Sequence, residues 1–126
     1  MNLPVTAAML YTLVIAGVIV FQCCLIAGAP WGHLTQGGQK PGTLPMSGRM
    51  IAFFSIPLLV FMGAGVASAA NLPPGWPIWT GWLALGVQTL VTILNWITRS
   101  VPERKLWGPI TSVMLGIAAY AVISKP

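Results

Sequence analysis

The sequence predicts an all-α protein, a four-transmembrane-helix bundle with an ordered interfacial loop between its first two helices. The chain is 56% hydrophobic and only 6% charged over its 126 residues, whereas soluble domains carry about 25% charged residues. A helix needs about 20 apolar residues to cross the hydrocarbon core, and the apolar segments lack the alternation of barrel strands. We expect a single integral membrane domain over residues 1–126, with helices at about 5–29, 50–70, 78–98 and 108–123.

The first and last apolar segments each need a specific interpretation. Residues 5–29 are expected to form a retained helix, because no positive side chain precedes them and they exceed the about 7–15 residues of a signal-peptide core. Residues 108–123 fall short of a full span. This fourth helix is therefore expected to stand upright in the membrane or to be extended by snorkelling residues such as Lys125.

The distribution of positive charge predicts the orientation. Cytoplasmic loops carry an excess of Lys and Arg, so we expect loops 30–49 and 99–107 in the cytoplasm and both termini outside, in a bacterial inner membrane. The opposite side has only Lys125. These cations form no basic stripe, which disfavours a nucleic-acid partner; membrane lipids are the expected surroundings. The loop cations are Lys40, Arg49, Arg99, Arg104 and Lys105.

Small residues four positions apart predict close helix packing. Such spacing lets two backbones approach each other in lipid. The pairs are Gly63 with Ala67 in the second helix and Ser112 with Gly116 in the fourth.

A polar face on the third helix is the main candidate for function within the membrane. Gln88, Thr92, Asn95 and Arg99 share one side of a helix by their spacing, and Gln22 of the first helix is a plausible partner. Buried polar groups need hydrogen-bond partners in lipid. Interhelical hydrogen bonding is the preferred interpretation, and a path for a solute is the alternative.

Catalytic and metal-binding residues are not predicted. Glu103 is the only carboxylate in the chain, which excludes paired-carboxylate hydrolysis and carboxylate-bridged metals. Cys23 and Cys24 are adjacent and point about 100° apart on a helix, so buried free thiols are expected. His33 is best explained as a solvated or hydrogen-bonded loop residue. We predict no cofactor.

The loop after the first helix, "APWGHLTQGGQKPGTLPMSGR", is expected to be ordered. Gly37 and Gly38 supply the positive φ angles of a tight hairpin. Pro30 ends the first helix, while Pro41 and Pro45 stiffen the return of the chain. An interfacial cap is favoured over an anion cradle, because the P-loop pattern is missing.

This loop and the segment "LNWITRSVPERKLWGP" together resemble a family of small bacterial four-helix membrane proteins with no assigned activity. The resemblance covers nearly the whole chain and implies that the two segments pack together, with Glu103 as the counter-ion for Arg49 or Arg104. Trp31, Gly37, Gly38, Arg49, Glu103, Arg104 and Trp107 are then candidates for one interfacial cluster. The matching residues are Ala29, Pro30, Trp31, Gly32, Gly37, Gly38, Leu44, Pro45 and Arg49, then Asn95, Ser100, Pro102, Glu103, Arg104, Trp107 and Pro109.

These features favour a non-catalytic accessory subunit. It would pack through its small-residue helix faces against larger membrane protein subunits or as a homo-oligomer. The alternative is an oligomeric channel or transporter for a small solute, which would use the polar face of the third helix. An enzyme acting on a lipid or isoprenoid ranks third, because His33, Glu103, the tyrosines and the thiols are its only acid–base groups.

Overall fold

The computed structural model describes residues 2–124, and this part of the chain is all-helical. Each of its four long helices is long and apolar enough to cross a membrane, which confirms the predicted fold class. Lys125, expected to extend the last helix, lies outside the described residues. The elements are α1 Leu3–Ala27, the short 3₁₀ turns η1 Gly32–Leu34 and η2 Gln36–Gly38, α2 Met46–Ala69, α3 Ile78–Ile97 and α4 Val101–Ile123.

The prediction of a short fourth helix is wrong. Helix α4 begins at Val101 instead of 108, because Ser100 caps it: the Ser100 hydroxyl accepts a hydrogen bond from the Glu103 amide at 3.3 Å. Pro102 fits this first turn, where a backbone N–H would have no helical partner. The first turn is polar, so apolarity alone does not reveal it. Glu103 therefore lies in a helix and not in a loop.

The other predicted helix boundaries also shift by a few residues. Helix α1 begins at Leu3, since the Asn2 side chain accepts from the Val5 amide at 3.1 Å, and it ends before Gly28, whose φ is 109°. Helix α2 begins at Met46 directly after Pro45. The first turn of α2 precedes the apolar segment because it contains Ser47, Gly48 and Arg49, and α1 gains its first residues because Asn2 caps it.

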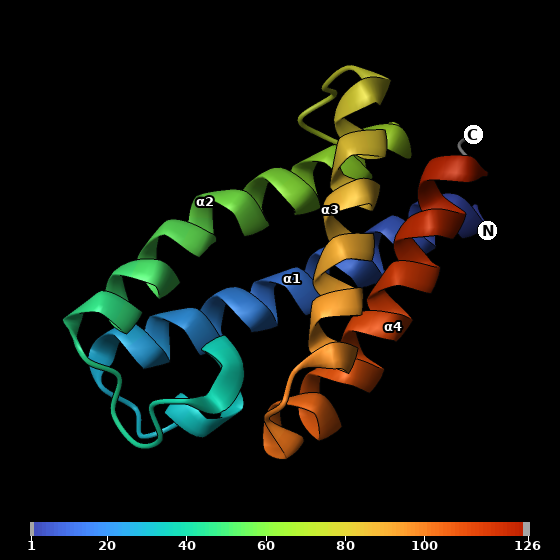
Figure 1. The fold of residues 1–126 in the computed structure, drawn as a ribbon. Helices are drawn as coiled ribbons and strands as arrows, with labels where there is room; N and C mark the ends of the chain where they lie inside the picture. Colours follow the sequence, from blue (N-terminus) through green and yellow to red (C-terminus); the bar gives the residue numbers. More distant parts are fainter. Residues whose placement is uncertain (1, 125–126) are drawn as a thin grey trace.

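The helices form two pairs that diverge toward one end of the molecule (Figure 1). Helix α1 packs along α2, and α3 packs along α4. The pairs meet near the turn between α2 and α3, at the end where α1 begins and α4 ends (Figure 1). The long loop between α1 and α2 lies at the opposite, wide end and contacts α4.

Close backbone contact holds the pairs together at their narrow end. A Cβ added to Gly65 would lie 2.7 Å from the Thr80 carbonyl oxygen, and one added to Gly81 would lie 3.2 Å from the Gly65 carbonyl oxygen. Only glycine permits this approach of α2 to α3. The core around it is apolar and includes Tyr11, Ile15, Met62, Val66, Ala84, Met114, Ala118 and Val122.

The predicted small-residue faces differ in what they contact. Gly63 and Ala67 are buried, and a Cβ on Gly63 would lie 3.3 Å from Ile15. The Ser112 hydroxyl accepts from the Trp96 indole N–H at 2.7 Å. Gly116, by contrast, is exposed and has no atom near the position of a Cβ. Within the described chain, Gly116 therefore makes no close helix contact.

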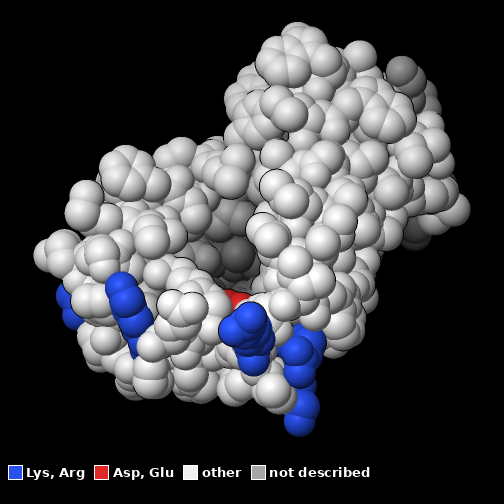
Figure 2. Space-filling view, in the orientation of Figure 1, with Lys and Arg blue, Asp and Glu red and all other residues white. Residues whose placement is uncertain are grey.

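Positive charge gathers at the wide end of the molecule. Figure 2 shows Lys and Arg side chains along this edge, where the long loop and the connection between α3 and α4 lie. The fold therefore places the two cationic loops at the same end, as four consecutive spans require. Their orientation in a membrane stays a prediction.

Candidate functional site

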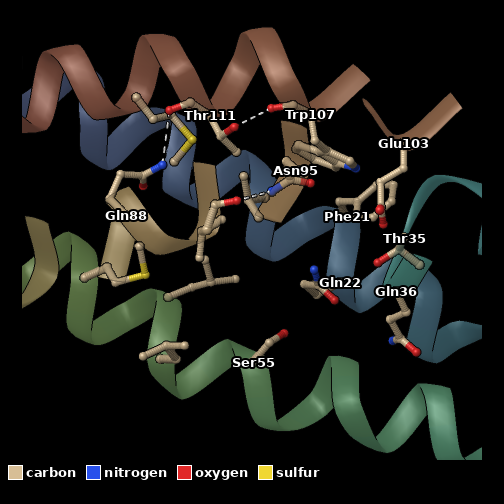
Figure 3. A pocket seen from close by; sticks show the side chains of 16 residues that line it. Phe21, Gln22, Thr35, Gln36, Ser55, Gln88, Asn95, Glu103, Trp107 and Thr111 are labelled. Atoms are coloured by element: carbon tan, nitrogen blue, oxygen red, sulfur yellow. Dashed lines mark hydrogen bonds between the residues drawn. The ribbon is translucent and has the colours of Figure 1, made fainter. Parts of the chain in front are cut away.

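A cavity of about 250 Å³ lies where the two helix pairs diverge. Figure 2 shows it as a hollow between two lobes, and Figure 3 shows its lining. We call this space the cleft. All four long helices and the loop contribute to it: Val18, Phe21, Gln22, Thr35, Gln36, Ser55, Leu58, Leu59, Met62, Gln88, Val91, Asn95, Glu103, Trp107, Thr111 and Met114.

Polar side chains lie along the whole cleft. Gln22, Gln36 and Glu103 lie on the side of the loop, Gln88 and Thr111 lie toward the opposite side, and Ser55 and Asn95 lie between them (Figure 3). Aliphatic and thioether side chains complete the walls. The cleft is therefore amphipathic.

Both the oxygen and the nitrogen of the Gln88 side-chain amide are hydrogen-bonded at the deep end of the cleft, the end opposite the loop. Gln88 is 1% exposed. Its Oε1 accepts from the Tyr11 hydroxyl at 2.8 Å, and its Nε2 donates to the Thr111 carbonyl at 3.2 Å and to the Thr92 hydroxyl at 3.3 Å. Thr92 in turn donates to the Thr111 carbonyl at 3.1 Å. This part of the polar face therefore joins α1, α3 and α4.

The rest of the predicted polar face is arranged differently. Gln22 lines the same cleft, but Tyr11 takes the role expected of it as the partner of Gln88. Asn95 donates to the Val91 carbonyl of its own helix at 2.8 Å. Arg99 lies beyond the end of α3, because Thr98 adopts an extended conformation. Arg99 is therefore exposed and does not belong to the face.

One face of α4 holds the loop across the wide end of the cleft. The Ser100 hydroxyl donates to the His33 carbonyl at 3.0 Å, and the Trp107 indole N–H donates to the Leu34 carbonyl at 2.8 Å. Between them, Glu103 Oε2 accepts from the Gly37 amide at 3.1 Å. Ser100, the N-cap of α4, and Glu103 and Trp107 within α4 are spaced to share a helical face. We call their contacts with the loop the loop latch.

Aromatic rings reinforce the loop latch. Trp31 of the loop stacks on Phe21 of α1 with ring centres 5.6 Å apart. Phe21 also meets Trp107 edge to face at 4.9 Å. Sequence reasoning missed Phe21, because an aromatic residue in an apolar helix gives no signal of its own.

The ion pair implied by the family resemblance does not form among the described residues. Arg49 Nε donates to the Leu44 carbonyl at 3.0 Å, and Arg104 Nη1 donates to the Thr98 carbonyl at 3.0 Å. Carbonyls next to helix ends lack helical partners, which makes them good acceptors for arginine. The side chain of Glu103 is instead bound by a backbone amide.

The described residues contain no group of three or more His, Cys, Asp or Glu side chains that could hold a metal ion. Both cysteines are free; Cys24 is half-buried, while Cys23 is exposed and not buried as expected. The sulfur-containing side chains that line the cleft are Met62 and Met114.

Comparisons of the chain with protein-family models, with curated proteins and with solved structures find no match. The resemblance to small four-helix bacterial proteins therefore stays a prediction.

Gly38→Ala should open the loop latch. Gly38 has a φ of 67°, and a Cβ there would lie 2.6 Å from the Ser100 Cβ. Hydrogen exchange of loop amides, measured by mass spectrometry, should accelerate about tenfold more than in the control, which corresponds to ~1.4 kcal/mol. Gly42→Ala is the matched control, since Gly42 has a φ of 82° but open space around it. Equal acceleration of hydrogen exchange in both variants would show that the packing of Ser100 against Gly38 does not hold the loop in place.

Proposed function

We propose that the protein is a membrane-embedded binding protein that holds one small amphipathic molecule in the cleft. The observation that carries the proposal is a cavity of about 250 Å³ with apolar walls and a polar end beside the loop. Ligand sites are typically concave and mostly apolar, about 300–1,000 Å³ in volume, with a few placed polar groups. The lining of the cleft matches this description, and its volume lies just below the range, so its ligand would be small.

The energetics of an empty cleft support an occupant. The cleft is open on one side, and part of its lining is apolar, including Leu58, Leu59 and Met62. Apolar surface is stabilised when it is removed from water. A molecule with an apolar part would cover these side chains, while its polar part could meet the polar side chains of the same lining.

The polar end of the cleft supports recognition of a head group. Gln22 and Asn95 line the cleft and are half-buried; the Nδ2 of Asn95 already donates to Val91, so its oxygen is the group left to accept from a ligand. A ligand can form hydrogen bonds with such groups, whereas apolar lipid chains cannot. The deep end differs, because Gln88 already has three partners there.

The functions expected from the sequence stay predictions. Tyr11 and Thr111 hold the α3 polar face within one chain, an arrangement that supports helix packing over a pore between chains. Docking as an accessory subunit is compatible with ligand binding in the cleft.

Filling the cleft should remove its occupant. Ser55→Trp places an indole in the lining, and the Ser55 hydroxyl it removes bonds only to Ala52 of the same helix. The protein would be extracted gently into lipid nanodiscs, and small molecules that coelute would be quantified by mass spectrometry. The wild type should retain about one amphipathic compound per chain, and Ser55→Trp should retain at least about tenfold less.

Leu90→Trp is the matched control, because Leu90 is 56% exposed and lies outside the cleft lining. It should retain the same compound as the wild type. If all three proteins carry the same molecules in the same amounts, those molecules surround the protein instead of occupying the cleft, and the proposal fails.

A further inference from the structure

We propose that the cleft selects an organic cation with an apolar body, and that the carboxylate of Glu103 holds the positive charge. This inference rests on the proposed function and specifies the chemical class of its ligand. It comes from the position of one carboxylate, from the way its hydrogen bonds are used, and from the rings beside it.

The cleft carries a negative charge in a positively charged protein. The chain has a formal net charge of +5, and Glu103 is its only acidic residue. This residue is 7% exposed and lines the cleft. The lining contains no Lys, Arg or His. The formal charge of the lining is therefore opposite in sign to that of the whole chain.

Glu103 is turned away from its usual local partner. Ser100 and Glu103 have the spacing of a capping box, in which the glutamate would accept from the Ser100 amide. Here the Ser100 amide donates to the Thr98 hydroxyl at 3.3 Å, and Glu103 Oε2 accepts from Gly37 across the loop. The side chain therefore lies between the loop and the cleft.

Glu103 forms no ion pair among the described residues, although Figure 2 shows a Lys or Arg side chain beside its exposed atoms. Arg49 and Arg104 donate to backbone carbonyls, and the observed partner of the carboxylate is one neutral amide. A buried charge is costly unless it is paired and further hydrogen-bonded. A positively charged ligand supplies the missing pair, and Oε1 can receive it without breaking the bond to Gly37.

The surroundings of Glu103 favour an organic cation over a metal ion. Phe21 and Trp107 line the same part of the cleft (Figure 3), and their rings meet at 4.9 Å. Aromatic faces attract ammonium groups within about 6 Å. Hard metal ions instead need six or more oxygen ligands and gain nothing from apolar walls. An alkylated or arylated ammonium uses both the carboxylate and the rings.

The inference is tested with a cation and its uncharged counterpart of the same shape. Wild-type protein in phosphatidylcholine nanodiscs would be titrated calorimetrically with benzyltrimethylammonium and with neopentylbenzene, after subtraction of empty nanodiscs. The cation should bind at least about tenfold more tightly than the hydrocarbon. A titration with sodium chloride alone should give no heat that depends on Glu103.

Glu103→Gln removes the charge and keeps an oxygen that can accept from Gly37. This variant should lose the preference for the cation while retaining affinity for neopentylbenzene. Lys105→Gln is the control for remote charge, because Lys105 is exposed and lies outside the lining. It should keep the wild-type preference. If Glu103→Gln does not fold, the relative affinity of the wild type for the two compounds still shows whether the cleft selects a cation.

The outcomes separate this inference from the proposed function. Equal affinity of the wild type for both compounds would overturn the charge selection and leave the cleft as a binding site. A response to sodium that requires Glu103, without a response to benzyltrimethylammonium, would replace the organic cation with an inorganic one. If neither compound binds and no molecule coelutes with the wild type, the proposed function fails as well.

Discussion

Gly65→Ala should lower the free energy of unfolding by about 1–3 kcal/mol, the range found when atoms are forced into a packed contact. The new methyl group would lie 2.7 Å from the Thr80 carbonyl oxygen and 3.0 Å from its carbonyl carbon. Both atoms belong to the backbone, so no side-chain rotation relieves the contact. Helix α3 must move away from α2 at the narrow end of the molecule.

The effect of Gly65→Ala is measured against Gly17→Ala by reversible unfolding in mixed micelles. Gly17 also lies within a long helix, but no atom would approach its Cβ within 4 Å. Alanine there should stabilise by up to about 1 kcal/mol, because its helix propensity exceeds that of glycine. If the two variants unfold alike, the close approach of α2 and α3 does not hold the bundle together.

Gln88→Leu should destabilise the protein by about 1–3 kcal/mol, because it leaves buried partners without a hydrogen bond. The substitution nearly preserves volume. It removes the acceptor of Tyr11 and the donor to Thr111, so the links from α3 to α1 and α4 are lost together. Individual hydrogen bonds in lipid average only about 0.6 kcal/mol, so the joint loss dominates.

The control for Gln88→Leu is Thr89→Val. The exposed Thr89 hydroxyl donates only to Leu85 of its own helix, at 2.8 Å, and its loss should change stability by less than about 0.5 kcal/mol. In a double-mutant cycle, the variant that carries both Gln88→Leu and Tyr11→Phe should lose less free energy of unfolding than the two single variants lose in total. Strict additivity would mean that Tyr11 and Gln88 do not stabilise each other.

The fold class follows from composition, because a chain this poor in charge can satisfy its backbone in lipid only by forming helices or a barrel. The start of α4 does not follow from composition. Its first turn contains Glu103 and Arg104, which apolarity assigns to a loop. The Ser100 cap was the available signal: a serine three residues before a glutamate marks a helix start.

The candidate site is less predictable than the fold. The spacing of Gln88 and Thr92 correctly places both side chains inside the bundle, where both are buried. The cleft itself depends on the angle between two helix pairs. Helices α2 and α3 approach closely at Gly65 and Gly81, and neither residue belongs to the small-residue pairs that the sequence suggested. Phe21 gains its role only through rings that approach it from the loop and from α4.

Photolabelling tests the central claim, that a small amphipathic molecule enters the cleft, most directly. An octylamine that carries a diazirine in its chain would be irradiated with the protein in nanodiscs, and labelled peptides would be mapped by mass spectrometry. The account predicts labels on Leu59, Met62 and Met114, which line the cleft, and their loss in Ser55→Trp. Labels confined to outward-facing residues such as Leu13 and Phe54, which are 68% and 64% exposed, and unchanged in Ser55→Trp, would contradict it.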